Sequence, residues 1–130
     1  KSTLMKAIGL NLVMAQAGMY VSSKTFKYTP YTQIFTRILN NDNIFRSQSS
    51  FAVEIQELKS ILKRANNKSL VLGDELCSGT ERESALSIFV AGLTNMHEKQ
   101  SSFIFATHFH EVVKYEEIKN LVSLALESKR

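Results

Sequence analysis

Apolar residues along this chain follow two spacings, and these spacings predict an alternation of helices and strands. One face of a helix is indicated near the start, where apolar side chains recur three or four positions apart at Leu4, Ile8, Leu12 and Ala15. Gly18 then supplies a stop signal. The helical spacing returns at Phe51, Ile55, Leu58 and Leu62. Two short runs are instead apolar throughout, which is typical of strands buried on both faces: Leu70-Val71-Leu72 and Phe103-Ile104-Phe105.

These patterns predict helices over residues 2–17, 51–66, 81–97 and 111–117, and strands over 24–28, 33–39, 69–75, 102–107 and 121–126. Segment 40–50 is rich in Asn, Asp and Ser and predicts a long loop, in which Ser49 or Ser50 can cap the next helix. Helices that alternate with short apolar strands indicate an α/β fold, layered around a largely parallel sheet.

Composition narrows the class of protein. The 130 residues suit one domain, and 44% hydrophobic with 22% charged residues is a globular composition. No apolar run is long enough to cross a membrane, and polar residues interrupt the start, so neither a spanning segment nor a signal peptide is predicted. The single cysteine, Cys77, excludes an internal disulfide and fits an intracellular, reducing compartment. The chain begins at Lys1 without an initiator Met and reads as a piece of a longer protein.

The net charge of +4 is compatible with a phosphate-bearing partner. The lysines and arginines are scattered, however, and no segment is a dense basic patch. This distribution favours ordinary surface charge over a nucleic-acid footprint.

Asp74 and Glu75 follow directly on the first apolar run, in the stretch LVLGDEL. In parallel α/β sheets, ligands bind outside the carboxyl ends of the strands. A carboxylate there can hold Mg²⁺, and its neighbour can orient or deprotonate a water. Acidic pairs also end strands simply because the chain meets solvent, so the pair alone leaves both interpretations open.

Lys1-Ser2-Thr3 stands at the head of the first predicted helix, where the last residues of a phosphate-binding loop, G-x-x-x-x-G-K-[ST], would stand. The N-terminus of such a helix offers free N–H groups and a partial positive charge to a phosphate. By itself this tripeptide is more often an ordinary helix start. Together with a strand that ends in Asp-Glu about seventy residues later, it follows the order of the two nucleotide motifs of a P-loop ATPase.

His108 comes just after the second apolar run, where its ring could contact a γ-phosphate or the attacking water. A capping or surface histidine is the alternative. The cluster His108-x-His110-Glu111 also has the residue types of a metal site, but no distant third ligand is evident and zinc is disfavoured.

Four stretches together resemble the ATPase domain of the MutS proteins of DNA mismatch repair, an ABC-type P-loop ATPase. They are, in chain order, KSTLMKAIGLNLVMAQAGMYV, QIFTRILNNDNIFRSQSSFAVEIQEL, LVLGDELCSGTERE and FIFATHFHEV. The resemblance covers nearly the whole chain and implies a three-layer P-loop NTPase sandwich with a largely parallel sheet. It also implies bound ATP and Mg²⁺, hydrolysis of ATP, a parent protein that binds mismatched double-stranded DNA, and a homodimer or paralogous heterodimer with no membrane attachment.

The resemblance further implies roles for the residues at the head of the first helix. Lys1 would bind the β- and γ-phosphates, and Thr3 would add a phosphate contact. Ser2 and Asp74 would hold Mg²⁺.

Other matched residues would act on the attacking water or across a dimer. Glu75 would position and activate the hydrolytic water, and His108 would contact the γ-phosphate. Ser49, with Ser50 beside it, falls where the family places a signature-loop serine that reaches into the partner's nucleotide site. Gly79-Thr80 lies where a turn helps to join the two sites.

The chain departs from the family pattern in several places. The Gly-rich segment before Lys1 and the closing helical segment are absent, so the domain is expected to be truncated at both ends and to bind ATP poorly by itself. Cys77-Ser78 takes the place of the usual Gly-Arg, and Glu81-Arg82 takes the place of the usual Ser-Thr. These replacements indicate a divergent branch of the family. Cytoplasm or nucleoid, nucleus, a DNA-containing organelle and a viral factory all remain open as locations.

Two alternative functions stay open. One is another ABC-type ATPase of DNA repair or chromosome organisation, although the chain has no Leu-Ser-Gly-Gly-type signature. The other is a non-catalytic dimerisation module that has lost its ATPase site. The presence of Asp74, Glu75 and His108 beside an intact Lys-Ser-Thr argues against such a loss.

Overall fold

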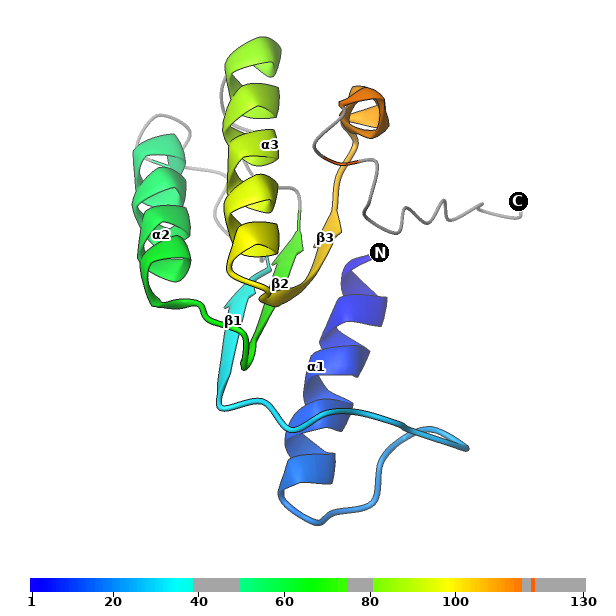
Figure 1. Ribbon diagram of the computed structural model, residues 1–130. Coiled ribbons are helices and arrows are strands. Elements are labelled where there is room, and N and C mark those ends of the chain that lie inside the picture. The colour runs from blue at the N-terminus through cyan, green and yellow to red at the C-terminus, as the bar shows by residue number, and fades with distance from the viewer. Residues whose placement is uncertain (39–49, 75–80, 116–117, 119–130) are drawn as a thin grey trace, which may run out of the picture.

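A computed structural model describes residues 1–38, 50–74, 81–115 and 118 (Figure 1). Its elements alternate between helix and strand, as the spacing of apolar residues predicts. In chain order they are α1 (Ser2–Gln16), β1 (Gln33–Arg37), α2 (Ser50–Arg64), β2 (Ser69–Asp74), α3 (Arg82–Glu98), β3 (Ser102–Ala106) and the 3₁₀ helix η1 (His110–Lys114).

The three strands form one sheet in the order β1-β2-β3, and both pairs are parallel. Phe35 lies opposite Val71, which lies opposite Phe103, so the strands are aligned with little stagger. A parallel sheet of this kind confirms the predicted α/β class.

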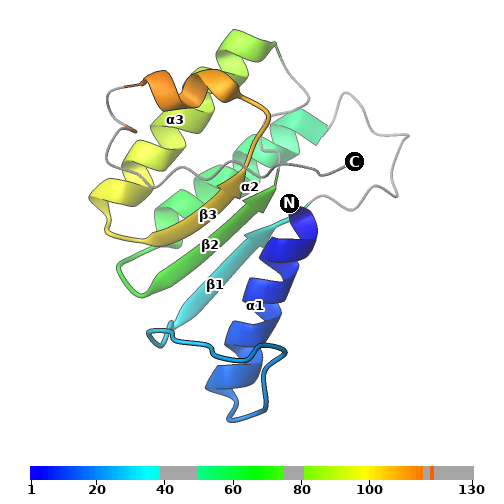
Figure 2. The ribbon, with the colours of Figure 1, turned by 90° about the vertical axis from the view of Figure 1, so that its right-hand side faces the viewer.

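Helices cover both faces of the sheet. On one face, Leu12 of α1 packs against Leu70 and Leu72 of β2. On the other face, Val71 of β2 joins the larger core, which α2 and α3 supply with Leu58, Phe89, Leu93 and other side chains. All of β2 is buried because alternate side chains enter different cores. The result is a three-layer arrangement, with α1 on one side of the sheet and α2 and α3 on the other (Figures 1 and 2).

The end of α1 follows the sequence prediction. Gly18 adopts a φ of +75°, which an L side chain rarely adopts, and its N–H bonds to the carbonyl of Ala15 at 3.1 Å. The N–H of Met19 bonds to the carbonyl of Met14 at 2.9 Å, so the last carbonyls of the helix are satisfied by backbone donors.

Two sequence predictions need correction. Residues 24–28 do not form a strand, because no described strand lies alongside to supply the backbone partners that a strand requires. Instead, Phe26 turns toward the smaller core and its ring lies 5.7 Å from that of Tyr28. The helix predicted over 111–117 is the shorter 3₁₀ helix η1. The strand predicted over 121–126 lies outside the described residues, as does the end of the one predicted over 33–39.

A close approach in the sheet depends on Gly73, the residue before Asp74. The ring of Phe105 lies across it from β3, so that a Cβ at position 73 would stand 2.1 Å from Cε1 and 2.3 Å from Cδ1 of that ring. The ring is also held from the other side, since it meets Phe89 of α3 edge to face at a centroid distance of 5.6 Å. Glycine at this position therefore lets β2, β3 and α3 close on one another just below the strand end.

We expect Gly73→Ala to lower the free energy of unfolding by about 1–3 kcal/mol, because the new methyl group must displace a packed ring. Urea-induced unfolding, followed by circular dichroism, measures this change. Gly92→Ala in α3 is the matched control, since its Cβ would meet only Leu58, at 3.7 Å. The control should be neutral or stabilising by up to about 1 kcal/mol, because alanine is the better helix former. Equal losses in both variants would contradict the packing account.

Candidate functional site

The candidate site lies at the edge of the sheet where the strands end. Asp74 is the last residue of β2, and its register partner Ala106 is the last residue of β3. The first turn of α1 lies at the same edge, where Figure 1 places the N-terminus beside the ends of β2 and β3. The fold thus brings three segments together that are far apart in the sequence: residues 1–3, 74 and 107–108.

Asp74 and Ser2 are in direct contact. The Ser2 hydroxyl donates a short hydrogen bond to Oδ2 of Asp74. The carboxylate is 4% exposed, and its second oxygen, Oδ1, is buried without a hydrogen-bond partner among the described residues. Burying a carboxylate oxygen without a partner is costly, so an oxygen in this state is suited to receive a further group such as a cation.

Lys1 and His108 form the second contact of the site. The Lys1 ammonium donates to the carbonyl of Thr107 at 3.3 Å and lies 3.2 Å from Nδ1 and 3.3 Å from Nε2 of His108. A neutral imidazole has one nitrogen that can accept from an ammonium group. His108 lies in a turn between Thr107 and Phe109, in which the N–H of Phe109 donates to the Thr107 hydroxyl at 3.0 Å. Lys1 and His108 are both exposed, so their polar atoms face the space beyond the strand ends.

Four of the sequence-predicted site residues therefore come together: Lys1, Ser2, Asp74 and His108. Thr3 is exposed on the first turn of α1. The first turn of α1 contains no acidic residue, so no carboxylate of the helix itself offsets the positive end of the helix dipole.

The remaining predicted residues lie elsewhere or outside the described chain. Ser50 is the first residue of α2. Ser49, Glu75 and the turn Gly79-Thr80 lie outside the described residues.

Two features of this edge were not predicted from the sequence. The carbonyl of Thr107 accepts from Lys1, and a backbone acceptor leaves no mark in a side-chain pattern. Arg37 ends β1 and is ion-paired with Glu54, at 3.4 Å, and with Glu57, at 2.7 Å. An arginine at the end of the predicted strand was the available signal for this second feature.

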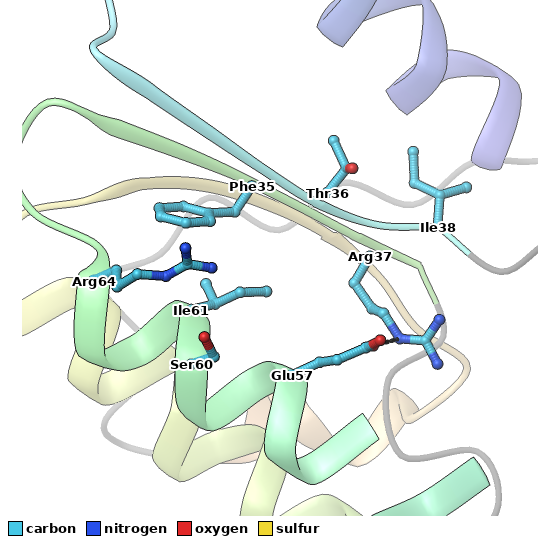
Figure 3. A pocket seen from close by; sticks show the side chains of 8 residues that line it. All are labelled: Phe35, Thr36, Arg37, Ile38, Glu57, Ser60, Ile61 and Arg64. Carbon is cyan, nitrogen blue, oxygen red and sulfur yellow. Dashed lines mark ion pairs between the residues drawn. The ribbon is translucent and has the colours of Figure 1, made fainter. Parts of the chain in front are cut away.

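A pocket of about 490 Å³ lies between β1 and α2 (Figure 3). Its floor contains Phe35, over which the Arg64 guanidinium stacks at 5.1 Å from the ring centroid, and the Arg37–Glu57 ion pair closes one end. Neither Ser2 nor Asp74 lines it, so this pocket is separate from the polar site at the strand ends.

No group of three or more His, Cys, Asp or Glu side chains within residues 1–38, 50–74, 81–115 and 118 is placed to hold a metal ion. In this part of the chain, Glu111 is ion-paired with Arg82 and does not join His108 and His110 as a ligand set. Within the same ranges, no helix has both the length and the apolar character that crossing a membrane would need.

Fold and site together define a parallel α/β protein with a buried carboxylate, a helix N-terminus and a lysine–histidine contact at the carboxyl edge of its sheet. Comparison with known sequences then identifies the family. The model of MutS domain V matches residues 1–130, so the chain belongs to this family of MutS mismatch-repair proteins.

Individual relatives agree with this assignment. The chain is 48% identical over 112 residues to a mitochondrial DNA mismatch repair protein mutS homolog of Sarcophyton glaucum, which covers 86% of the chain. It is 43% identical over 127 residues to a putative DNA mismatch repair protein mutS homolog of Acanthamoeba polyphaga mimivirus, which covers 95% of the chain. It is 40% identical over 117 residues, or 89% of the chain, to DNA mismatch repair protein MutS of Caldanaerobacter subterraneus. The match spans 11%, 11% and 14% of these three relatives, respectively.

We expect Ser2→Ala to lower the free energy of unfolding by about 1–3 kcal/mol, because it removes the described donor from a buried carboxylate. Thr3→Ala is the matched control, since Thr3 is exposed on the next position of the same helix and should change stability by less than about 0.5 kcal/mol. Urea-induced unfolding without added nucleotide or metal makes the comparison. An unchanged midpoint for Ser2→Ala would show that the hydrogen bond contributes nothing to stability.

Proposed function

We propose that this chain is part of an ABC-type P-loop ATPase domain, and that the protein containing it binds and hydrolyses ATP with Mg²⁺. The observation that carries the proposal is the meeting of Ser2 with Asp74 and of Lys1 with His108 at one edge of a parallel sheet. A P-loop nucleotide site uses a hydroxyl and a carboxylate on its metal side and a lysine on its phosphate side, and Ser2, Asp74 and Lys1 supply these groups.

The phosphate side would be formed by Lys1 and the start of α1. An ammonium group at the head of a 15-residue helix adds a full charge to the partial charge of the helix dipole. The first amides of the helix have no acceptor within it and can donate to phosphate oxygens. Lys1 would contact the β- and γ-phosphates, and Thr3 would add its hydroxyl or its amide.

The metal side would be formed by Ser2 and Asp74. Both offer hard oxygen atoms, which Mg²⁺ prefers. Oδ1 of Asp74, which has no partner in the part of the chain that the structure describes, is a buried acceptor that fits a cation or one of its waters. When bound, Mg²⁺ supplies charge neutralisation along the phosphate chain. Among the chain's own residues, the hydroxyl of Ser2 orients the Asp74 carboxylate by donating to Oδ2.

Hydrolysis would need a group that positions the attacking water and one that contacts the γ-phosphate. We assign the first role to Glu75, which follows Asp74 directly, and the second to His108. The contact between His108 and Lys1 supports the second assignment, because both would then face the same phosphate. Catalysis of this type rests on positioning and charge stabilisation around the transferred phosphoryl group.

In the complete protein, we propose that ATP turnover is coupled to closure of a homodimer or paralogous heterodimer and to binding of mismatched double-stranded DNA. The family assignment supports this coupling, and the names of the relatives place them in DNA mismatch repair. Ser49 and Ser50 would act across the dimer interface. The protein would then work in a compartment that holds DNA.

Mutation of the proposed water-activating residue tests the catalytic assignment. In the complete protein, Glu75→Gln should retain ATP binding and lower steady-state ATP hydrolysis by about 100-fold or more, because the amide cannot accept the proton from water. Glu83→Gln provides a matched control, since Glu83 is an exposed carboxylate at the start of α3. Equal turnover in Glu75→Gln and the unchanged protein would contradict the role of Glu75 in positioning the attacking water.

Nucleotide binding separates the ATPase from a non-catalytic dimerisation module. Titration of the complete protein with a fluorescent ATP analogue should give saturable, Mg²⁺-dependent binding, and Lys1→Ala should weaken it because a phosphate contact is lost. Lys6→Ala, an exposed lysine one turn further along α1, should leave the affinity unchanged. No binding at about 1 mM nucleotide would favour the dimerisation module instead.

A further inference from the structure

An ion pair links the start of α3 to the short helix that follows His108. Nη2 of Arg82 lies 2.6 Å from Oε1 of Glu111, close enough for a charge-assisted hydrogen bond. Arg82 is the first residue of α3, and Glu111 is the second residue of η1. The pair therefore joins two segments that are 29 positions apart in the sequence.

The turn that carries His108 has polar contacts through Thr107, whose carbonyl accepts from Lys1 and whose hydroxyl accepts from the N–H of Phe109. Its inner side is held by the Phe109 ring, which lies 6.3 Å from the ring of Phe89 on α3, and by Val112, which is 6% exposed in the larger core. Figure 2 shows η1 lying over α3 in agreement with these contacts. Apolar contacts set the height of η1 above α3 but are not directional. The ion pair adds a directional contact on the flank of η1.

We propose that Arg82 and Glu111 are a positioning pair, which holds η1 against α3 and so keeps His108 in contact with Lys1. The inference rests on the proposed ATPase function, because it is the γ-phosphate that His108 would face. Neither residue touches the nucleotide, and both act through the turn Thr107–Phe109.

The geometry supports this link because the path from the ion pair to the site is short. Only two residues lie between His108 and Glu111, and the N–H of His110 bonds to the carbonyl of His108 at 3.0 Å. A roll of η1 is thus passed directly to the backbone that carries the imidazole.

Charge reversal tests the pair through the kinetics of the complete protein. Arg82→Glu and Glu111→Arg should each lower kcat for ATP hydrolysis about two- to five-fold, the range that a solvent-exposed ion pair provides, with KM for ATP unchanged within about two-fold. The double variant, which restores an ion pair with its charges exchanged, should recover kcat to within about two-fold of the unchanged protein. Unchanged kcat in the single variants, or no recovery in the double variant, would overturn the proposal.

A control variant separates the pair from a general loss of surface charge. Glu83→Gln removes a carboxylate next to Arg82 but takes no part in the ion pair. This variant should leave kcat unchanged. A fall in kcat that matches that of the reversal variants would point to a diffuse charge effect and would count against the pair.

A measurement without turnover separates this inference from the proposed function. The hydrogen bond from Arg82 is the largest cause that lowers the pKa of Glu111 below its ordinary value, with smaller contributions from the charges of Arg82 and Lys114. Arg82→Ala should therefore raise the pKa of Glu111 in a ¹³C NMR titration of its carboxyl group. Because a lowered pKa means that the ionised carboxylate stabilises the fold at neutral pH, that stabilisation should diminish in the variant. The ring resonances of His108 should shift in the same variant. If the unchanged protein does not hydrolyse ATP, the proposed function fails. If the His108 resonances do not move in Arg82→Ala, the positioning role fails, whether or not the protein hydrolyses ATP.

Discussion

Parallel pairing of β1, β2 and β3 is the constraint on which the site depends. Every strand of a parallel sheet delivers its last residue to the same edge, so Asp74 and the Thr107–His108 turn must lie side by side once β2 and β3 pair in register. The packing of Leu12 against Leu70 and Leu72 then fixes α1 on the sheet and brings its first turn to that edge. Residues from three distant segments meet without any local signal between them.

This edge contains a carboxylate whose placement costs stability. Asp74 is buried, and only the Ser2 hydroxyl is seen to satisfy one of its oxygens within the described chain. A protein that had only to fold would gain by replacing this acid with an apolar residue. A buried acceptor with no partner among the described residues is understandable where a cation is to be received.

Most of the fold could be predicted from the sequence, and the failures have physical causes. Uninterrupted apolar runs identified β2 and β3, and β2 is buried along its whole length as such a run predicts. The same expectation was wrong for β3, in which Ile104 is exposed. The segment around Phe26 failed because a strand needs a neighbouring backbone as well as an alternating pattern. The segment after His108 has a helical composition, yet it forms only a short 3₁₀ helix held to α3 by Phe109 and Glu111. For the site, residue types and order were sufficient to predict which groups belong together, but not their contacts.

The sequence alone determined the α/β class and the two-sided burial of β2, and it predicted the residues of the site, because periodicity and motif order are local or one-dimensional properties. Only the tertiary structure decided that Oδ1 of Asp74 has no partner among the described residues and that the Thr107 carbonyl accepts from Lys1. The pairing of Arg82 with Glu111 was decided in the same way. Each of these contacts depends on how α1, α3 and η1 are placed around the sheet, and that placement results from packing many side chains at once.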